Sequence, residues 1–358
     1  MQNNQAIPFN KENFKAIFSK EFALVIIISV PSAIVAEFFN IPLAWFLGPM
    51  LITSLASLMG LKTKMPKLVL SSILILLGLY IGNYIDKSLF SQMHQWAFTS
   101  LIMLIYIIVS VLIVSKYLQI FSKYGRKTSI FSAAPGALGP LMILAEDEKS
   151  DLSQVATSHL IRLIIIITIF PFFVNSFYDA ENTKIVEEII KDQNILHLIL
   201  LIVSSIILII IFDKFRIPAA LLSGTLFASG FLQISEIASY QLPPNIIDYC
   251  LLILGASVGC RFANKTFSEI ARNALHSFVA TFLLVLLGLL AAFAASLIID
   301  KNFFTLLLSY CPGGIYEVAV IAIFFDLDPE FVSFHHIIRL LMILFIVPLI
   351  LRIIEKKT

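Results

Sequence analysis

The chain has 358 residues, of which 59% are hydrophobic and only 13% are charged, and its mean hydropathy is +0.95. A soluble globular domain is nearer half apolar and a quarter charged, so this composition excludes that class. The apolar residues also occur in runs of about 18 residues or more, the length that crosses the hydrocarbon core of a bilayer. We therefore expect an all-α polytopic membrane protein whose surroundings are the lipid bilayer. The net charge of +2 gives no indication of a nucleic-acid partner.

Twelve apolar runs follow the polar N-terminus, six on each side of a charged segment. The first six runs are 22–39, 43–60, 68–85, 97–115, 128–145 and 152–177. The second six runs are 195–212, 218–235, 246–261, 274–298, 303–325 and 331–351. This pattern predicts a first membrane repeat at 1–178, a charged linker at 179–194 and a second membrane repeat at 195–358.

The two predicted repeats share one register. Many residues of the second part of each half recur unchanged 177 positions later, among them a Pro-Gly pair, an Asp, a His and an Arg. The first members of these pairs include Pro135, Gly136, Ala145, Asp151, Val155, His159, Ile161, Arg162, Leu163 and Pro171. Gly78 and Gly82 recur as Gly255 and Gly259, and we interpret them as positions where helices pack closely. The shared register indicates an internal duplication.

Basic residues in the short loops predict how the chain is oriented. The lysines before the first run place the N-terminus in the cytoplasm, and Lys356 and Lys357 do the same for the C-terminus. The uncharged turn at 39–42 would then be outside, whereas its copy at 213–217 carries basic residues and would be inside. The repeats are therefore predicted to be inverted, with about five spans each plus one run that does not cross. The alternative is six full spans in each half, which would make the repeats parallel.

The run that does not cross is predicted to be the one that carries Pro and Gly. Proline removes a helical hydrogen bond and glycine weakens a helix, so Pro135-Gly136 and Pro312-Gly313-Gly314 would each break a run into two half-helices. Paired broken helices in a membrane expose helix ends that can bind ions or anions. The alternative interpretation is a packing kink.

Each half also places a His and an Arg inside its last apolar run. His159 and Arg162, like His336 and Arg339, are three residues apart and so lie on one helix face. Ionisable residues at such positions usually face a bundle interior or a cavity, which makes these four residues candidates for a solute pathway. The alternative is that the arginines extend to the membrane interface with their charged ends in water.

Three carboxylates lie near these elements. Asp151 and Asp328 precede the His/Arg helices and are interpreted as helix caps, with an ion or proton role as the minor alternative. Glu317 lies five residues after Pro312 and is the candidate residue for coupling to protons or cations. Its counterpart in the first copy is Pro140, so the pair of repeats is unequal here.

The chain has no motif typical of an enzyme or a DNA-binding protein. It contains no HExxH sequence, no Cys/His ligand cluster, no phosphate-binding glycine loop and no GxSxG sequence. We therefore expect no metal, no cofactor and no enzymatic activity. No soluble segment is long enough to form a DNA-binding domain, so direct contact with nucleic acid is not expected.

The block Pro312-Gly313-Gly314-Ile315-Tyr316-Glu317, followed by Asp328, His335-His336 and Arg339, resembles the AbrB-type duplicated membrane protein family. The stretch from Ile41 to Met50 is also similar to that family's opening. The resemblance covers nearly the whole chain. It implies a bacterial membrane protein whose relatives are labelled regulators of gene expression or ammonia monooxygenases. The first copy departs from the family pattern, because Ala137 replaces the second glycine and Pro140 replaces the glutamate.

These patterns predict a multi-pass protein of the bacterial inner membrane that resembles a secondary transporter and carries a small solute. Its site would lie between the two repeats, lined by both broken helices. Arg162 and Arg339 would contact a small organic anion, and Glu317 would couple transport to an ion. The alternative is a membrane-bound protein that affects gene expression indirectly.

Overall fold

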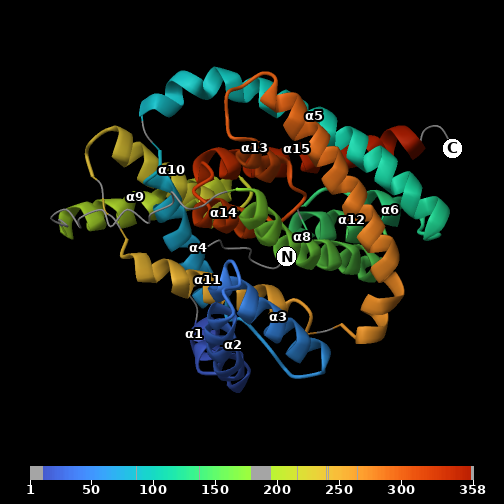
Figure 1. Cartoon of the computed structure of the whole chain (residues 1–358), viewed down its shortest axis with the longest axis horizontal. Coiled ribbons are helices and arrows are strands. Elements are labelled where there is room, and N and C mark those ends of the chain that lie inside the picture. The colour runs from blue at the N-terminus through green and yellow to red at the C-terminus, as the bar shows by residue number, and fades with distance from the viewer. Residues whose placement is uncertain are drawn as a thin grey trace. The chain divides into compact units, whose positions relative to one another are not determined.

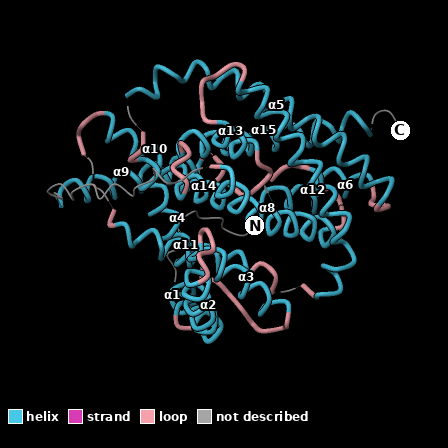
Figure 2. The backbone as a smooth tube through the Cα atoms, viewed as in Figure 1, coloured by secondary structure: helices cyan, strands magenta, loops and turns pink. Residues whose placement is uncertain are grey.

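The computed structural model describes residues 11–355, apart from Asp86, Ala137, 179–194, Arg216, Ser239, Gln241 and Asn264. The described residues form α-helices joined by loops, as the tube in Figure 2 shows. The predicted linker at 179–194 lies outside the described residues. The described part of the chain is therefore all-helical, as the composition predicts.

The helices follow the predicted apolar runs closely. Among the described residues, six helices are long and apolar enough to cross a membrane, three in each half. These six spans are 13–38, 96–121, 152–177, 195–214, 267–296 and 329–353. With this set and the shorter apolar helices between them, the protein is a polytopic membrane protein.

Two helices begin well before the apolar runs that mark them. The helix α5 begins at Lys87 and α12 begins at Phe267, although their apolar runs begin at 97 and 274. The residues in between include polar helix-forming side chains such as Gln92 and Glu269. Hydropathy detects only the part of a helix that suits hydrocarbon, so it does not detect polar helical extensions of this kind.

The chain divides into two compact units, and each unit takes helices from both predicted repeats. Unit 1 consists of residues 1–90, 171–266 and 323–330, and unit 2 consists of 91–170, 267–322 and 331–358. Unit 1 contains α1 (Lys11–Ile17), α2 (Lys20–Phe38), α3 (Ala44–Leu58), α4 (Lys67–Gly82), α9 (Ile195–Lys214), α10 (Ala220–Ile234) and α11 (Pro244–Cys260). Unit 2 contains most of α5 (Lys87–Phe121), α6 (Arg126–Ala133), α7 (Leu138–Asp147), most of α8 (Leu152–Phe177), α12 (Phe267–Ser296), α13 (Phe303–Tyr310), most of α14 (Ile315–Phe324) and most of α15 (Pro329–Glu355).

Unit 1 is held together by a reciprocal packing of glycine helices. A Cβ atom built on Gly78 of α4 would lie 2.6 Å from the carbonyl oxygen of Leu222 on α10. In the other half, a Cβ on Gly255 of α11 would lie 2.2 Å from the carbonyl oxygen of Phe46 on α3. Phe46 and Leu222 are 176 residues apart, and each half of the chain supplies the glycine helix that packs on the other half. Figure 1 shows blue α3 beside yellow α11.

We expect Gly255→Ala to lower the free energy of unfolding by about 1–3 kcal/mol, because the new methyl group meets backbone that cannot move aside. Gly139→Ala is the matched control, since a Cβ atom there meets nothing within 4 Å. Chemical denaturation of the purified protein in detergent would compare the two variants. Equal stability of both would contradict the close contact between α11 and α3.

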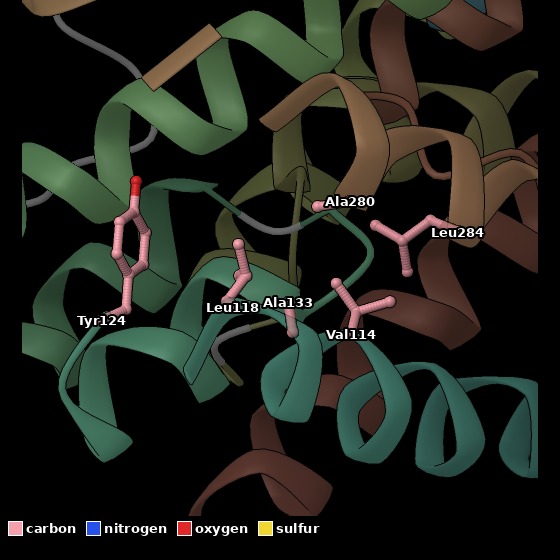
Figure 3. Close-up of a cluster of buried hydrophobic side chains, with 6 residues drawn as sticks. All are labelled: Val114, Leu118, Tyr124, Ala133, Ala280 and Leu284. Carbon is pink, nitrogen blue, oxygen red and sulfur yellow. The ribbon is translucent and has the colours of Figure 1, made fainter. Parts of the chain in front are cut away.

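Unit 2 has an apolar core formed by helices of both halves. The cluster in Figure 3 brings together Val114, Leu118 and Tyr124 with Ala133 of α6 and with Ala280 and Leu284 of α12. The helix α13 also packs on α12, where Gly288 lies close to the carbonyl of Tyr310. These contacts fix the half-helices α6 and α13, which lead into the two Pro-Gly segments.

Candidate functional site

Both predicted breaks are present. The helix α6 ends at Ala133 and α7 begins at Leu138, and in the second half α13 ends at Tyr310 and α14 begins at Ile315. The residue after each first half-helix is extended in the same way, with φ −61° and ψ 130° at Ala134 and φ −60° and ψ 130° at Cys311. Each apolar run is therefore two half-helices joined by unwound backbone.

The His/Arg pair of the first half binds the end of α6. His159 Nε2 donates to the carbonyl of Phe131 at 3.0 Å. Arg162 donates through Nη1 to the carbonyl of Ala134 at 2.6 Å and through Nη2 to that of Ser132 at 2.5 Å. The last carbonyls of a helix have no partner within the helix, so His159 and Arg162 satisfy the end that the break leaves open.

The pair of the second half does the same at equivalent positions. His336 Nε2 donates to the carbonyl of Leu308 at 3.0 Å. Arg339 donates through Nη1 to the carbonyl of Cys311 and through Nη2 to that of Gly313, at 2.7 Å for the latter. Nη2 of Arg339 also donates to Nδ1 of His336 at 3.0 Å. His159 and Arg162 form no such bond in the described part of the chain.

Both guanidinium groups are enclosed by protein, which contradicts the alternative that they extend to the interface. Arg162 is 2% exposed and Arg339 is 1% exposed. Their partners within the described residues are carbonyls and one imidazole, and neither group forms an ion pair there. A cation at a helix C-terminus is stabilised by the partial negative charge of that end. The arginines therefore act as built-in cations at two half-helix ends.

The two breaks meet inside unit 2. Gly136 has φ +106°, and a Cβ atom built on it would lie 2.9 Å from Nη2 of Arg339 and 3.3 Å from the carbonyl oxygen of Gly313. The first break thus lies against the second break and against the arginine that holds it. Only glycine combines this φ with so close an approach. The two predicted Pro-Gly segments are therefore in contact through Gly136 and Gly313 within unit 2.

Glu317 lies on α14, the half-helix that follows the second break. It is 1% exposed and occupies the first turn of α14. A Cβ atom built on Gly314 would lie 1.9 Å from Oε2 of Glu317, so the carboxylate folds back over the start of its own helix. Carboxylates are favoured at helix N-termini, and Gly314 leaves the space that this one occupies.

Comparison with known proteins identifies the chain's relatives. The sequence profile described as Transition state regulatory protein AbrB matches residues 2–82 and 45–355. The chain belongs to the AbrB family. It is 22% identical over 319 residues to "Putative regulator AbrB" of Escherichia coli (strain K12), which covers 88% of this chain and 91% of that protein. It is also 23% identical over 304 residues to "Uncharacterized protein YhjN" of Bacillus subtilis (strain 168), covering 79% of each. No solved structure matches.

Asp151 and Asp328 of this AbrB-family chain are less buried than Arg162, Arg339 and Glu317. The backbone N–H of Gln154 donates to Oδ1 of Asp151 at 3.0 Å, so Asp151 caps α8 as its sequence context predicts. Asp328 precedes α15 with φ 42° and belongs to unit 1.

A third histidine of the AbrB-family chain lies in a separate buried cluster that the sequence did not indicate. His335 Nδ1 donates to the carbonyl of Phe331 at 2.9 Å, and its Nε2 lies 2.7 Å from Oγ1 of Thr99. Tyr310 donates to the carbonyl of Thr99 at 2.8 Å. The counterpart of His335 is Ser158, so the duplication gave no signal for it. Thr99 is remote in sequence and has no motif around it.

Within the described residues, no group of three or more His, Cys, Asp or Glu side chains could hold a metal ion. Four carbonyl oxygens around the two breaks accept from the arginines, namely those of Ser132, Ala134, Cys311 and Gly313. The site therefore offers buried positive charge, one carboxylate and unwound backbone.

Proposed function

We propose that this AbrB-family protein is a carrier of a small solute that works like a secondary transporter, with its site at the meeting point of the two broken helices. The observation that supports this function is the contact of Gly136 with Arg339 and Gly313, which joins the breaks of both halves. Unwound backbone inside a membrane protein is tolerated only where protein or a water-filled cavity surrounds it. Paired discontinuous helices are the usual way in which transporters build a site.

In this proposal the two repeats are inverted and the protein lies in the bacterial inner membrane with both termini in the cytoplasm. The matching bonds of His159 and His336, and of Arg162 and Arg339, support a structural equivalence of the two halves. Glu317 is the coupling residue, since it is the buried carboxylate at the meeting point. Reporter fusions at residues 40 and 215 test the inversion, because they would then lie on opposite sides of the membrane.

Uptake into proteoliposomes tests the transport function. We expect labelled small organic anions to accumulate when a proton or sodium gradient is imposed, and we expect Glu317→Gln to lower gradient-driven uptake about tenfold or more, because it removes a buried group from the site. Glu37→Gln is the matched control, since Glu37 is an exposed residue of α2 in unit 1. Folded protein that accumulates no tested class of solute, or an active Glu317→Gln variant, would contradict the proposal.

A second function follows from the names of the family and of the Escherichia coli relative, which describe regulators. In this alternative the protein affects gene expression indirectly, through a transported signal or a partner. Deleting the gene and measuring transcripts would detect the effect. If the effect persists in a strain that carries Glu317→Gln together with Arg339→Ala, regulation does not depend on the site, and the transport mechanism does not explain it.

A further inference from the structure

Four half-helix ends face the two breaks, and three of them carry a side chain of complementary charge. The C-terminal ends of α6 and α13 are partially negative and hold Arg162 and Arg339. The N-terminal end of α14 is partially positive and carries Glu317. The N-terminal end of α7 has no acidic residue in its first turn, where Pro140 replaces the glutamate. One of the four ends therefore lacks its counter-charge.

The buried charges at the site show the same deficit. Two guanidinium groups are buried at the breaks, Glu317 is buried in the first turn of α14, and neither guanidinium is paired with a carboxylate in the described part of the chain. A buried charge without an opposite partner is costly. One negative charge is thus missing from the first copy.

Unused hydrogen-bonding groups lie in the same place. The Nε atoms of Arg162 and Arg339 are buried and have no partner among the described residues. The guanidinium of Arg339 lies against Gly136, two residues before α7 begins. The hydroxyl of Ser132, at the end of α6, also lacks a described partner, whereas that of its counterpart Ser309 donates to the carbonyl of Thr305 at 2.8 Å. These buried groups therefore have hydrogen-bonding capacity that the described residues leave unused.

We propose that the solute binds as an anion, through a carboxylate group, at the N-terminal end of α7. This inference rests on the transport function proposed above and names the class of its substrate. The second copy indicates the chemistry, since there the carboxylate of Glu317 occupies the start of α14. In the first copy a carboxylate of the solute occupies the start of α7 in the same way, with Arg162 and Arg339 beside it. A guanidinium group matches a carboxylate through two parallel hydrogen bonds.

A cation or a neutral solute fits this position less well. The helix N-terminus and the two guanidinium groups all present positive charge to it, so a cation would be repelled. A neutral solute would leave the charge deficit in place. The anion also explains why the first copy can lack a glutamate, because a fixed carboxylate at residue 140 would occupy the site permanently.

The first test supplies the missing carboxylate from the chain itself. The double variant Ala137→Gly with Pro140→Glu gives the first copy the Pro-Gly-Gly-x-x-Glu sequence of the second. Its matched control is Ala137→Gly with Pro140→Gln, which has the same shape without the charge. We expect the glutamate variant to unfold about 2 °C or more above the glutamine variant in the absence of any solute. An equal or lower melting temperature would overturn the proposal.

The second test measures binding to the full-length protein in detergent. Acetate, butyrate, succinate and citrate are added as sodium salts, with sodium chloride at the same ionic strength as the reference. At least one carboxylate is expected to raise the melting temperature of the wild type and of the glutamine variant, and to bind about tenfold or more weakly to the glutamate variant. A wild type that no carboxylate stabilises, or a glutamate variant that binds as tightly, would overturn the proposal.

The two proposals fail in different ways. Carboxylate binding without gradient-driven uptake would leave the anion site in place and reject the transport function. Uptake of a neutral or cationic solute, with no effect of the glutamate variant, would retain the transport function and reject the anion.

Discussion

Arg339→Met is expected to lower the free energy of unfolding by about 2–4 kcal/mol. The change leaves the carbonyls of Cys311 and Gly313 and Nδ1 of His336 without the donor that satisfies them, and each buried unsatisfied group costs about 1–3 kcal/mol. Relief from burying an unpaired cation offsets part of this loss, which is why the expected value lies below the sum. Denaturant unfolding of the detergent-solubilised protein measures it.

Arg352→Met is the control for this prediction, because Arg352 is an exposed residue in the last turn of the same helix. It should change stability by no more than about 0.5 kcal/mol. The loss of stability in Arg339→Lys should lie between those of the two methionine variants. Its ammonium group keeps the charge but lacks the planar set of donors of a guanidinium group. If Arg339→Met were as stable as Arg352→Met, the bonds to the second break would not contribute to holding it.

Gly136→Ala adds a single methyl group and is expected to lower the free energy of unfolding by about 3 kcal/mol or more. The backbone has φ +106°, a conformation that residues other than glycine rarely adopt. The new Cβ atom would also lie 2.9 Å from Nη2 of Arg339. The arginine would have to move, and its bonds to the second break would weaken. The melting temperature should therefore fall, and solute binding should weaken.

Gly60→Ala separates the two causes. Gly60 has φ +89°, but a Cβ atom built on it meets nothing within 4 Å. It should cost about 1–2 kcal/mol through backbone strain alone. The additional loss in Gly136→Ala then reports the contact between the first break and Arg339. Equal losses in the two variants would mean that this contact carries no energy.

Local features of the fold could be predicted from the sequence because they depend on local chemistry. Hydropathy gave the helical runs, and Pro135-Gly136 and Pro312-Gly313-Gly314 gave the breaks within them. The spacing of Gly78 and Gly82 indicated close packing, which the structure contains. Each of these patterns follows from the preferences of a few consecutive residues.

The assembly of the two units could not be predicted in this way. The contacts of Gly78 with Leu222 and of Gly255 with Phe46 join helices far apart in sequence, and nothing in either helix specifies its partner. The spacing of His159 and Arg162 placed them on one helix face but did not identify what they bind. Their partners are backbone carbonyls, which every residue has, so no side-chain pattern marks them.

The reciprocal glycine packing of unit 1 has a consequence for biosynthesis. The helices α3 and α4 leave the ribosome first, but their partners α10 and α11 are translated more than a hundred residues later. Until then the surface around Gly78 has no helix to cover it, so the first half of the chain must wait in the membrane incompletely packed. The two halves produced as separate polypeptides should therefore be degraded when expressed alone and protected when expressed together.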